Sequence, residues 1–228
     1  MIVNANKLKQ KKYRNEFKQF LIEGEHLIIE AYRHGFLDVV FYQENDLDLA
    51  VDSYKVTKEI IEKLSDVSTP QGLIGICHYP TEKNLSERVL MLDRVQDPGN
   101  MGTLIRSAAA FGFQTLITNQ CVDVYNPKVI RSTQGALFMV DLVESDIIEF
   151  IEKQPSYHYY ATDLSGESHS IIRHHDKIGL ILGNESLGVD PLIIKKTNEV
   201  IKIPIINVES LNVAVAGSIL MYELGRVK

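Results

Sequence analysis

The clearest indication of the fold lies in residues 177–205, KIGLILGNESLGVDPLIIKKTNEVIKIPI. Its apolar beginning, 177–185, predicts a buried strand, while 190–198 predicts a helix and 199–205 another strand. Strands that are apolar along their whole length are typical of a parallel sheet with helices on both faces. The same alternation begins at residue 88, so we expect residues 88–228 to form an α/β domain on a parallel sheet.

The first 80 residues predict a smaller α/β unit, with four strands and two short helices between residues 17 and 80. The polar segment TEKNLSE, residues 81–87, shows no periodicity and is predicted to be a linker. The expected organisation is therefore an N-terminal domain over 1–80, a linker over 81–87 and a second domain over 88–228.

Composition limits the class of protein. The chain has 228 residues, of which 45% are apolar and 24% charged, as is ordinary for a soluble globular enzyme. Two cysteines exclude a disulfide framework and any Cys-x-x-Cys metal site. The chain has neither a run of 18 apolar residues nor an apolar core after its basic start, so we expect a cytoplasmic protein without a membrane span or secretory signal.

Charge is distributed unevenly along the chain. The net charge is −6, but residues 1–20 carry six lysine or arginine residues against one glutamate. A basic segment on an acidic body is suited to binding a polyanion. The alternative is a solvated, lysine-rich first helix.

Three loops of the second domain follow predicted strands, after residues 95, 183 and 205. Ligands of parallel sheets bind beyond the carboxyl ends of the strands, so these loops are candidate sites. The loop after residue 183 has glycines but lacks the motifs of a P-loop or a Rossmann turn, and no other segment supplies either. These two common phosphate-binding turns are therefore excluded.

Five polar residues of these loops could serve chemistry or structure. Asn100 is a candidate N-cap, and Arg106 stands on a helix face of small residues. Glu185 follows the buried strand, where it could orient a substrate or hold a cation. Ser210 and Asn212 lie where the last helix is expected to begin. The structural alternatives are a helix cap for Asn100, Ser210 and Asn212, a surface charge for Arg106, and a tight turn for Glu185.

Histidines do not indicate a metal centre. His169, His174 and His175 fall in SGESHSIIRHHDK, residues 165–177, a polar stretch that predicts a loop, and no cysteine lies near them. We therefore expect no metal.

Taken together, the three loops resemble the motifs of a known family. They read Asn-x5-Arg-x5-Gly from residue 100, Gly-x-Glu-x2-Gly from residue 183, and Ile-Pro-x5-Ser-Leu-Asn-Val-x-Val-Ala from residue 203. This set resembles the SpoU/TrmH family of S-adenosylmethionine-dependent RNA ribose 2′-O-methyltransferases, of the SPOUT class, over residues 88–228. FLIEGEHLIIEAYRHG, residues 20–35, resembles the family's substrate-binding domain, a ribosomal-protein-like α/β fold.

The resemblance implies a parallel-sheet domain with a deep trefoil knot, a topology that ordinary folding rules would reject. It also implies a homodimer packed through the knot region, with the active site near the interface. By motif position, the residues implied for binding S-adenosyl-L-methionine are Gly183, Ile203 and Leu211. Those implied for the active site are Asn100, Arg106, Glu185, Ser210 and Asn212.

The resemblance also implies that the basic N-terminus binds RNA. Phosphate contacts would position the RNA and would come from Lys9, Lys11, Lys12 and Arg14. For Arg106, a guanidinium keeps its proton at any accessible pH. Our hypothesis is therefore that Arg106 binds a substrate phosphate and stabilises developing negative charge on the attacking oxygen, and is not a general base.

Two further readings stay open. One is methylation of an RNA base, as in other SPOUT enzymes. The other is a non-catalytic RNA-binding or ribosome-binding protein that keeps the fold for stability or dimerisation. The expected substrate of the leading reading is ribosomal RNA or transfer RNA.

Overall fold

The computed structural model describes residues 2–80, 85–168 and 175–226. The chain divides into two compact units, one made of residues 1–82 and 123–139 and the other of residues 83–122 and 140–228. The segment 123–139, expected in the second domain, thus clusters with the N-terminal unit. Most of the expected linker, residues 81–84, lies outside the described residues.

The N-terminal unit has a mixed sheet of four strands in the order β1-β4-β2-β3. The strands are β1 (Gln19–Glu23), β2 (Leu37–Tyr42), β3 (Asp52–Lys55) and β4 (Leu73–His78). Around them lie α1 (Ile2–Lys7), α2 (Lys11–Phe17), α3 (Glu25–Arg33), α4 (Lys58–Leu64), α6 (Pro127–Thr133) and the 3-10 helix η1 (Ala136–Met139). The strand expected from residue 17 begins at Gln19, because α2 extends to Phe17 and is capped by Lys18 in a left-handed conformation with φ 54°.

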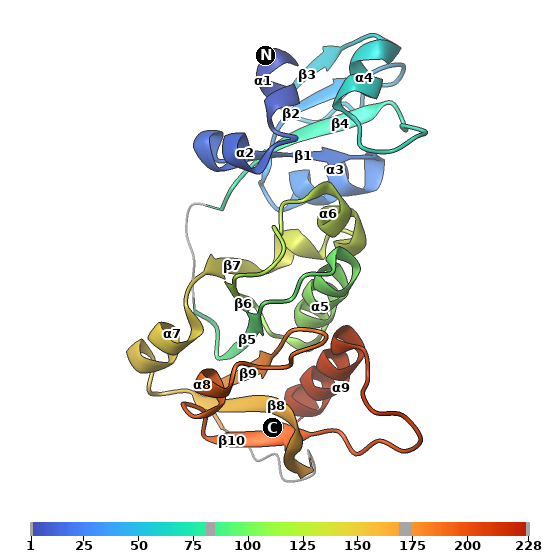
Figure 1. Cartoon of the computed structure of the whole chain (residues 1–228). Coiled ribbons are helices and arrows are strands. Elements are labelled where there is room, and N and C mark those ends of the chain that lie inside the picture. The colour runs from blue at the N-terminus through green and yellow to red at the C-terminus, as the bar shows by residue number, and fades with distance from the viewer. Residues whose placement is uncertain (1, 81–84, 169–174, 227–228) are drawn as a thin grey trace. The chain divides into compact units, whose positions relative to one another are not determined.

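The C-terminal unit has a sheet of six parallel strands in the order β10-β8-β9-β5-β6-β7 (Figure 1). The strands are β5 (Arg88–Asp93), β6 (Thr115–Asn119), β7 (Asp141–Glu144), β8 (His158–Ser168), β9 (Ile178–Leu182) and β10 (Glu199–Lys202). The helices are α5 (Pro98–Phe111), α7 (Ile147–Lys153), α8 (Pro191–Ile194) and α9 (Val213–Arg226). The predicted α/β fold with a parallel sheet is confirmed, while the knot stays a prediction.

Helices cover both faces of this sheet, which explains why its strands are apolar throughout. All five residues of β9 are buried. On one face, α7 and α8 pack on side chains such as Met91, Tyr159 and Ile181. On the other face, α5 and α9 lie side by side (Figure 1). A Cβ at Gly217 of α9 would lie 2.5 Å from Leu182 and 2.6 Å from Leu104, so the missing side chain lets α9 approach β9 and α5 closely.

A buried carboxylate fixes the edge of the sheet where the candidate loops begin. Asp93 ends β5 and is 1% exposed. Its oxygens accept hydrogen bonds from the Arg94 guanidinium, from the Asn119 amide at 3.2 Å and from the Asp190 backbone N–H at 3.0 Å. Asp93 therefore ties together the ends of β5 and β6 and the loop after β9. Across the described ranges, no helix combines the length and apolar character needed to cross a bilayer.

Candidate active site

The loops after β9 and β10 enclose a cavity of about 600 Å³ in the C-terminal unit. Its walls come from residues 182–188, from residues 201–213, from the first half of α9 and from β8 at residues 162–165. Gly183, Ile203 and Leu211, the residues implied for cofactor binding, all line this cavity. Its volume lies within the range of about 300–1,000 Å³ that is typical of small-molecule sites.

The loop after β9 folds back tightly on itself. The backbones of Asn184 and Gly188 exchange two hydrogen bonds, of 3.1 and 3.0 Å, and the Asn184 side chain accepts from the backbone N–H groups of Ser186 and Leu187. A Cβ at Gly183 would lie 2.0 Å from the carbonyl carbon of Gly188. Only glycine fits there, so this residue is required by the close approach of two backbones.

Three of the predicted active-site residues form one hydrogen-bonded chain beside the cavity. The Asn100 amide donates to Oε1 of Glu185 at 3.1 Å, and the Asn212 amide donates to Oδ1 of Asn100 at 2.8 Å. Each residue belongs to a different one of the three motifs, so the structure brings all three motifs together. Glu185 also lines the cavity, as does the exposed Ser210.

The predicted N-cap role of Asn100 is wrong. The helix α5 begins at Pro98, and Asp97 is its N-cap, with Oδ1 accepting from the Asn100 backbone N–H at 2.8 Å. Proline at the first helical position favours this start, two residues before Asn100. The Asn100 side chain is therefore available for Glu185 and Asn212.

Asn212 combines two functions. Its Oδ1 accepts from the backbone N–H groups of Ala214 at 2.9 Å and Val215 at 3.2 Å, which caps the first turn of α9. Its amide nitrogen donates to Asn100. The capping interpretation is thus correct for Asn212, but it does not account for the whole side chain.

Glu185 is held as a carboxylate. Partial burial raises its pKa, but hydrogen bonds from the Asn100 side chain and from the backbone N–H groups of Glu185, Asp97 and Gln96 together bring the pKa below its ordinary value. An ionised Glu185 accepts hydrogen bonds and orients their donors at neutral pH.

Arg106 stands apart from the other polar residues. Six helical positions of about 100° each place it on a different face of α5 from Asn100. It is exposed, together with Thr103 and Ala110 of the same face. Among the residues that the structure describes, none forms a hydrogen bond or an ion pair with Arg106. Within the described part of the chain, this guanidinium is therefore free to bind another molecule.

Sequence reasoning missed Asp93 and Asn184 as supports of the site. Asn184 donates to the Arg94 carbonyl at 2.8 Å, and Asp93 holds Asp190 on the far side of the same loop. The available signals were an aspartate ending an apolar strand and an asparagine before a Glu-Ser turn. Neither pattern indicates which residue the side chain contacts, because Asp190 and Arg94 are distant in the chain from Asp93 and Asn184 respectively.

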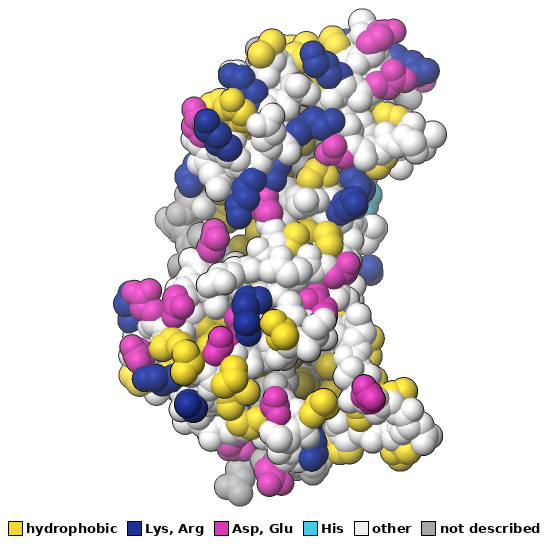
Figure 2. Space-filling model, in the orientation of Figure 1, with side chains coloured by type: hydrophobic (Ala, Val, Ile, Leu, Met, Phe, Trp, Pro, Cys, Tyr) yellow, Lys and Arg dark blue, Asp and Glu magenta, His cyan; other side chains and the backbone are white. Residues whose placement is uncertain are grey.

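The basic N-terminal segment is only partly available for RNA. Lysine and arginine side chains gather over α1 and α2 (Figure 2), and Lys11 and Lys12 are exposed. Lys9 instead donates to the carbonyls of Lys63 and Ser65 and pairs with Asp66. These contacts reduce its availability to a phosphate.

The predicted RNA contact by Arg14 is contradicted by its burial. The residue is 4% exposed, and its guanidinium donates to the carbonyls of Leu8 and Lys9 and to the Asp123 carboxylate. A guanidinium that is buried among partners of its own chain is not accessible to a phosphate.

Comparison with known proteins agrees with this geometry. The model of the SpoU rRNA methylase family matches residues 87–222, and that of the MRM3-like substrate-binding domain matches residues 1–75. The 23S rRNA (guanosine(2553)-2′-O)-methyltransferase RlmP of Bacillus subtilis is 36% identical over 96% of this chain and 93% of its own length. The mitochondrial rRNA methyltransferase 3 of Mus musculus is 32% identical over 75% of this chain and 46% of its own length.

A solved structure extends the likeness to three dimensions. The rRNA methyltransferase from Sinorhizobium meliloti, determined with bound AdoMet, has a TM-score of 0.87 and 27% identity, covering 99% of this chain and 94% of its own. The resemblance predicted from the three motifs is confirmed, and the chain belongs to the SpoU rRNA methylase family.

Proposed function

We propose that this chain transfers a methyl group from S-adenosylmethionine to a ribose 2′-hydroxyl of large-subunit ribosomal RNA. The observation that carries the proposal is the hydrogen-bonded chain from Glu185 through Asn100 to Asn212, which joins three separated motifs beside one cavity. The RNA class follows from RlmP, which is named for a guanosine of 23S rRNA. The two unpaired cysteines agree with a cytoplasmic location.

The cavity suits the proposed cofactor. Ile203 and Leu211 give it apolar walls for the uncharged parts of a nucleoside, while Ser210 and Glu185 add polar groups at its lining. When bound, S-adenosylmethionine supplies a methyl group that its sulfonium has already activated. The remaining catalytic task of the protein is to hold the ribose oxygen in line with that methyl group and to stabilise the charge on the oxygen.

The side chains divide this task. Glu185 fixes the Asn100 amide, and Asn212 fixes the Asn100 carbonyl oxygen, so Asn100 is held in one orientation for the ribose. Ser210 lines the same cavity, and we assign to it a contact with the attacking oxygen. Arg106 contributes a fixed positive charge that binds a substrate phosphate and stabilises the oxygen as its proton leaves to phosphate or water.

A second copy of the chain completes the site. Arg106 has no partner among the described residues and lies on an exposed face of α5, while the neighbouring α9 exposes Val215 (48%) and Tyr222 (45%). Val215 and Tyr222 are seven residues apart, so they lie on one face of α9, which a partner helix could cover. We place the homodimer contact on α5 and α9, with Arg106 of one copy serving the cavity of the other.

Mixing two inactive variants tests this arrangement. Arg106→Ala and Asn100→Ala, each inactive alone, are unfolded together and refolded as mixed dimers. Random pairing makes about half of the dimers mixed. If Arg106 acts across the interface, each mixed dimer has one intact site, made of Asn100 from one chain and Arg106 from the other. Activity then returns to about a quarter of wild type. If Arg106 serves its own chain, no mixed dimer has an intact site and activity stays at the background.

Methyl incorporation tests the activity itself. RNA from a strain that lacks the gene is incubated with the protein and S-adenosylmethionine carrying a tritiated methyl group, and the modified RNA is digested to nucleosides. We expect label in 23S rRNA as a 2′-O-methylated nucleoside and loss of label with Arg106→Ala. Lys153→Ala, an exposed cation on α7, is the control. A methylated base would favour the alternative SPOUT activity, and no label together with no cofactor binding would favour a non-catalytic RNA-binding protein.

For the N-terminal segment, we propose phosphate contacts from Lys11 and Lys12. Replacing both with alanine is expected to weaken RNA binding and to lower its dependence on salt. Lys58→Ala, an exposed lysine of α4, is the matched control. Binding that is unchanged at every salt concentration would remove α2 from the RNA interface.

A further inference from the structure

We propose that the C-terminal unit binds a divalent transition metal, with zinc as the best-suited ion, through His158, His175 and Glu199. Among the described residues these three are the one group of histidine, cysteine or acidic side chains with ligand atoms that all lie within 4.8 Å of one another. The inference is independent of the proposed methyl transfer. It also departs from the sequence-based expectation that no metal is bound.

The three ligands come from separate segments that the sheet holds together. His158 is the first residue of β8 and Glu199 is the first residue of β10, and these strands are neighbours in the sheet. The backbone N–H of His158 donates to the Lys177 carbonyl at 2.9 Å, which places His175 beside it. Backbone pairing thus fixes His158 and Glu199 before any metal binds, and the hydrogen bond to Lys177 holds the chain close to His175.

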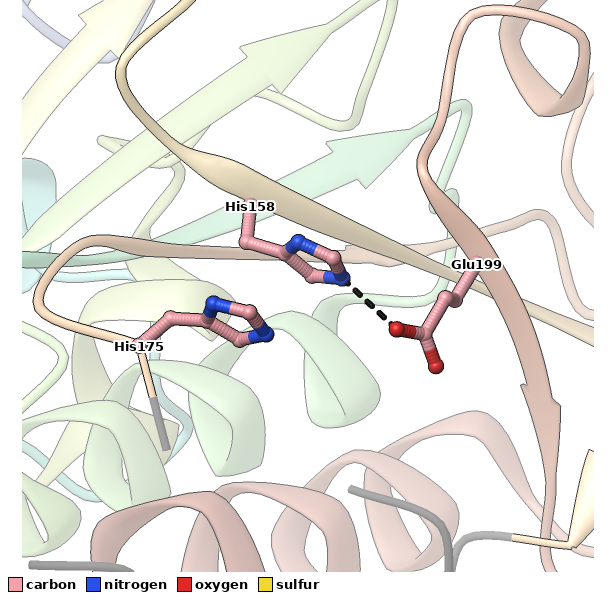
Figure 3. A group of neighbouring side chains, drawn as sticks. All are labelled: His158, His175 and Glu199. Carbon is pink, nitrogen blue, oxygen red and sulfur yellow. Dashed lines mark hydrogen bonds and ion pairs between the residues drawn. The ribbon is translucent and has the colours of Figure 1, made fainter. Parts of the chain in front are cut away.

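The side-chain geometry is close to that of a coordination site. Nε2 of His158 lies 3.0 Å from Oε1 of Glu199, and the rings of His158 and His175 lie face to face with centroids 3.7 Å apart. Figure 3 shows an outer nitrogen of each ring on the side where the Glu199 carboxylate lies. Tetrahedral zinc, with bonds of about 2.0–2.2 Å, places ligand atoms about 3.4 Å apart. Small rotations of the side chains would bring these atoms to that spacing.

The chemistry of the donors favours zinc over calcium or magnesium. Two imidazoles and one carboxylate form a nitrogen-rich set, whereas calcium and magnesium prefer oxygen ligands alone. All three residues are half-buried, so their side chains are partly shielded from water. Three protein ligands leave the fourth tetrahedral position for water.

The site is distinct from the candidate active site. It lies at the amino ends of β8 and β10, whereas the cavity is lined by later residues of β8, by Ile201 and Lys202 at the carboxyl end of β10 and by residues that follow β10. A bound ion would therefore cross-link the starts of two strands to the segment 175–177. Because the ion would bind only the folded unit, it would stabilise that unit without being needed for methyl transfer.

The test is metal binding by the full-length protein after treatment with EDTA and desalting. Titration calorimetry with zinc is expected to show one ion per chain, and cobalt(II) is expected to give the visible absorption of a tetrahedral site. Glu199→Gln and His175→Ala should each weaken zinc binding at least about tenfold. His78→Ala is the matched control, because His78 pairs with Asp38 at 2.7 Å without being part of such a group.

Glu199→Gln removes the negative charge of one ligand with little change of shape. It therefore tests zinc binding even if a histidine variant misfolds. Circular dichroism confirms that each variant is folded before titration. The proposal is overturned if the wild type binds no zinc stoichiometrically, or if Glu199→Gln and His175→Ala bind it as tightly as His78→Ala does.

Discussion

Replacing Gly183 with alanine should damage both the stability of the protein and its cofactor site. The added Cβ would lie 2.0 Å from the Gly188 carbonyl carbon and 2.1 Å from the Val189 nitrogen, whereas ordinary contact begins at 3.4 Å. Both obstacles are backbone atoms, so no side chain can rotate away. The loop 184–188 would have to move by roughly 1 Å or more, which places the cost at the upper end of the range for overpacking.

Two contributions lower the free energy of unfolding of Gly183→Ala. Overpacking costs about 1–3 kcal/mol, and disturbing the two backbone hydrogen bonds between Asn184 and Gly188 adds about 1 kcal/mol or more. A total of about 4 kcal/mol corresponds to a fall in Tm of about 8–16 °C for a chain of this size. Because the displaced loop lines the cavity, the affinity for S-adenosylmethionine should also fall at least about tenfold.

Thermal unfolding and titration calorimetry measure the two effects. The control is Gly35→Ala, where φ is +74° and a Cβ would meet no atom within 4 Å. That substitution carries only left-handed strain, of about 1–2 kcal/mol, and leaves cofactor binding unchanged. If Gly183→Ala has the same Tm and the same affinity for S-adenosylmethionine as Gly35→Ala, the loop 184–188 is not packed closely against Gly183.

Three further predictions concern buried and titrating groups. Asp93→Asn should lower the free energy of unfolding by about 2 kcal/mol or more, measured with urea, because the Arg94 guanidinium loses its buried carboxylate partner. Cys121 should resist alkylation at neutral pH until the protein unfolds, because burial raises its pKa to about 11, and rapid modification of the native protein would contradict this. The hydrogen bonds to Glu185 depress its pKa, so their contribution to stability is fully present above the ordinary value of 4.5 and is lost as the pH falls through the lower folded-state pKa. The difference in Tm between wild type and Glu185→Gln should therefore shrink on acidification below 4.5, and a constant difference would refute it.

The convergence of the three loops could be predicted from sequence because it follows from a general property of parallel sheets. Apolar runs identify the strands, and the carboxyl ends of parallel strands meet at one edge. Glu185 after β9 and Asn212 after β10 therefore had to lie on the same side of the sheet, and the structure joins them through Asn100.

Side-chain partners that depend on tertiary register were not predictable. Arg14 has the sequence context of a surface cation, but α2 turns it inward to Asp123, more than one hundred residues away. His158 and Glu199 read as isolated polar residues until β8 and β10 pair. The cap of α5 was misplaced for a local reason, since Asp97 precedes a proline and competes with Asn100 for the same role.

The same hydrogen bonds that orient the site also define where its helices begin. Asp97 caps α5 and donates its backbone N–H to Glu185, while Asn212 caps α9 and donates its amide to Asn100. The starts of the two helices are thus connected through Asn100 and Glu185 to the loop that closes the cavity. Because α5 and α9 also carry the exposed face with Arg106, the geometry of the cavity and that of the proposed dimer contact depend on one set of helix termini. A displacement of the helix termini at the cavity therefore also shifts the exposed face that carries Arg106. This gives a physical reason for an active site beside the proposed dimer contact.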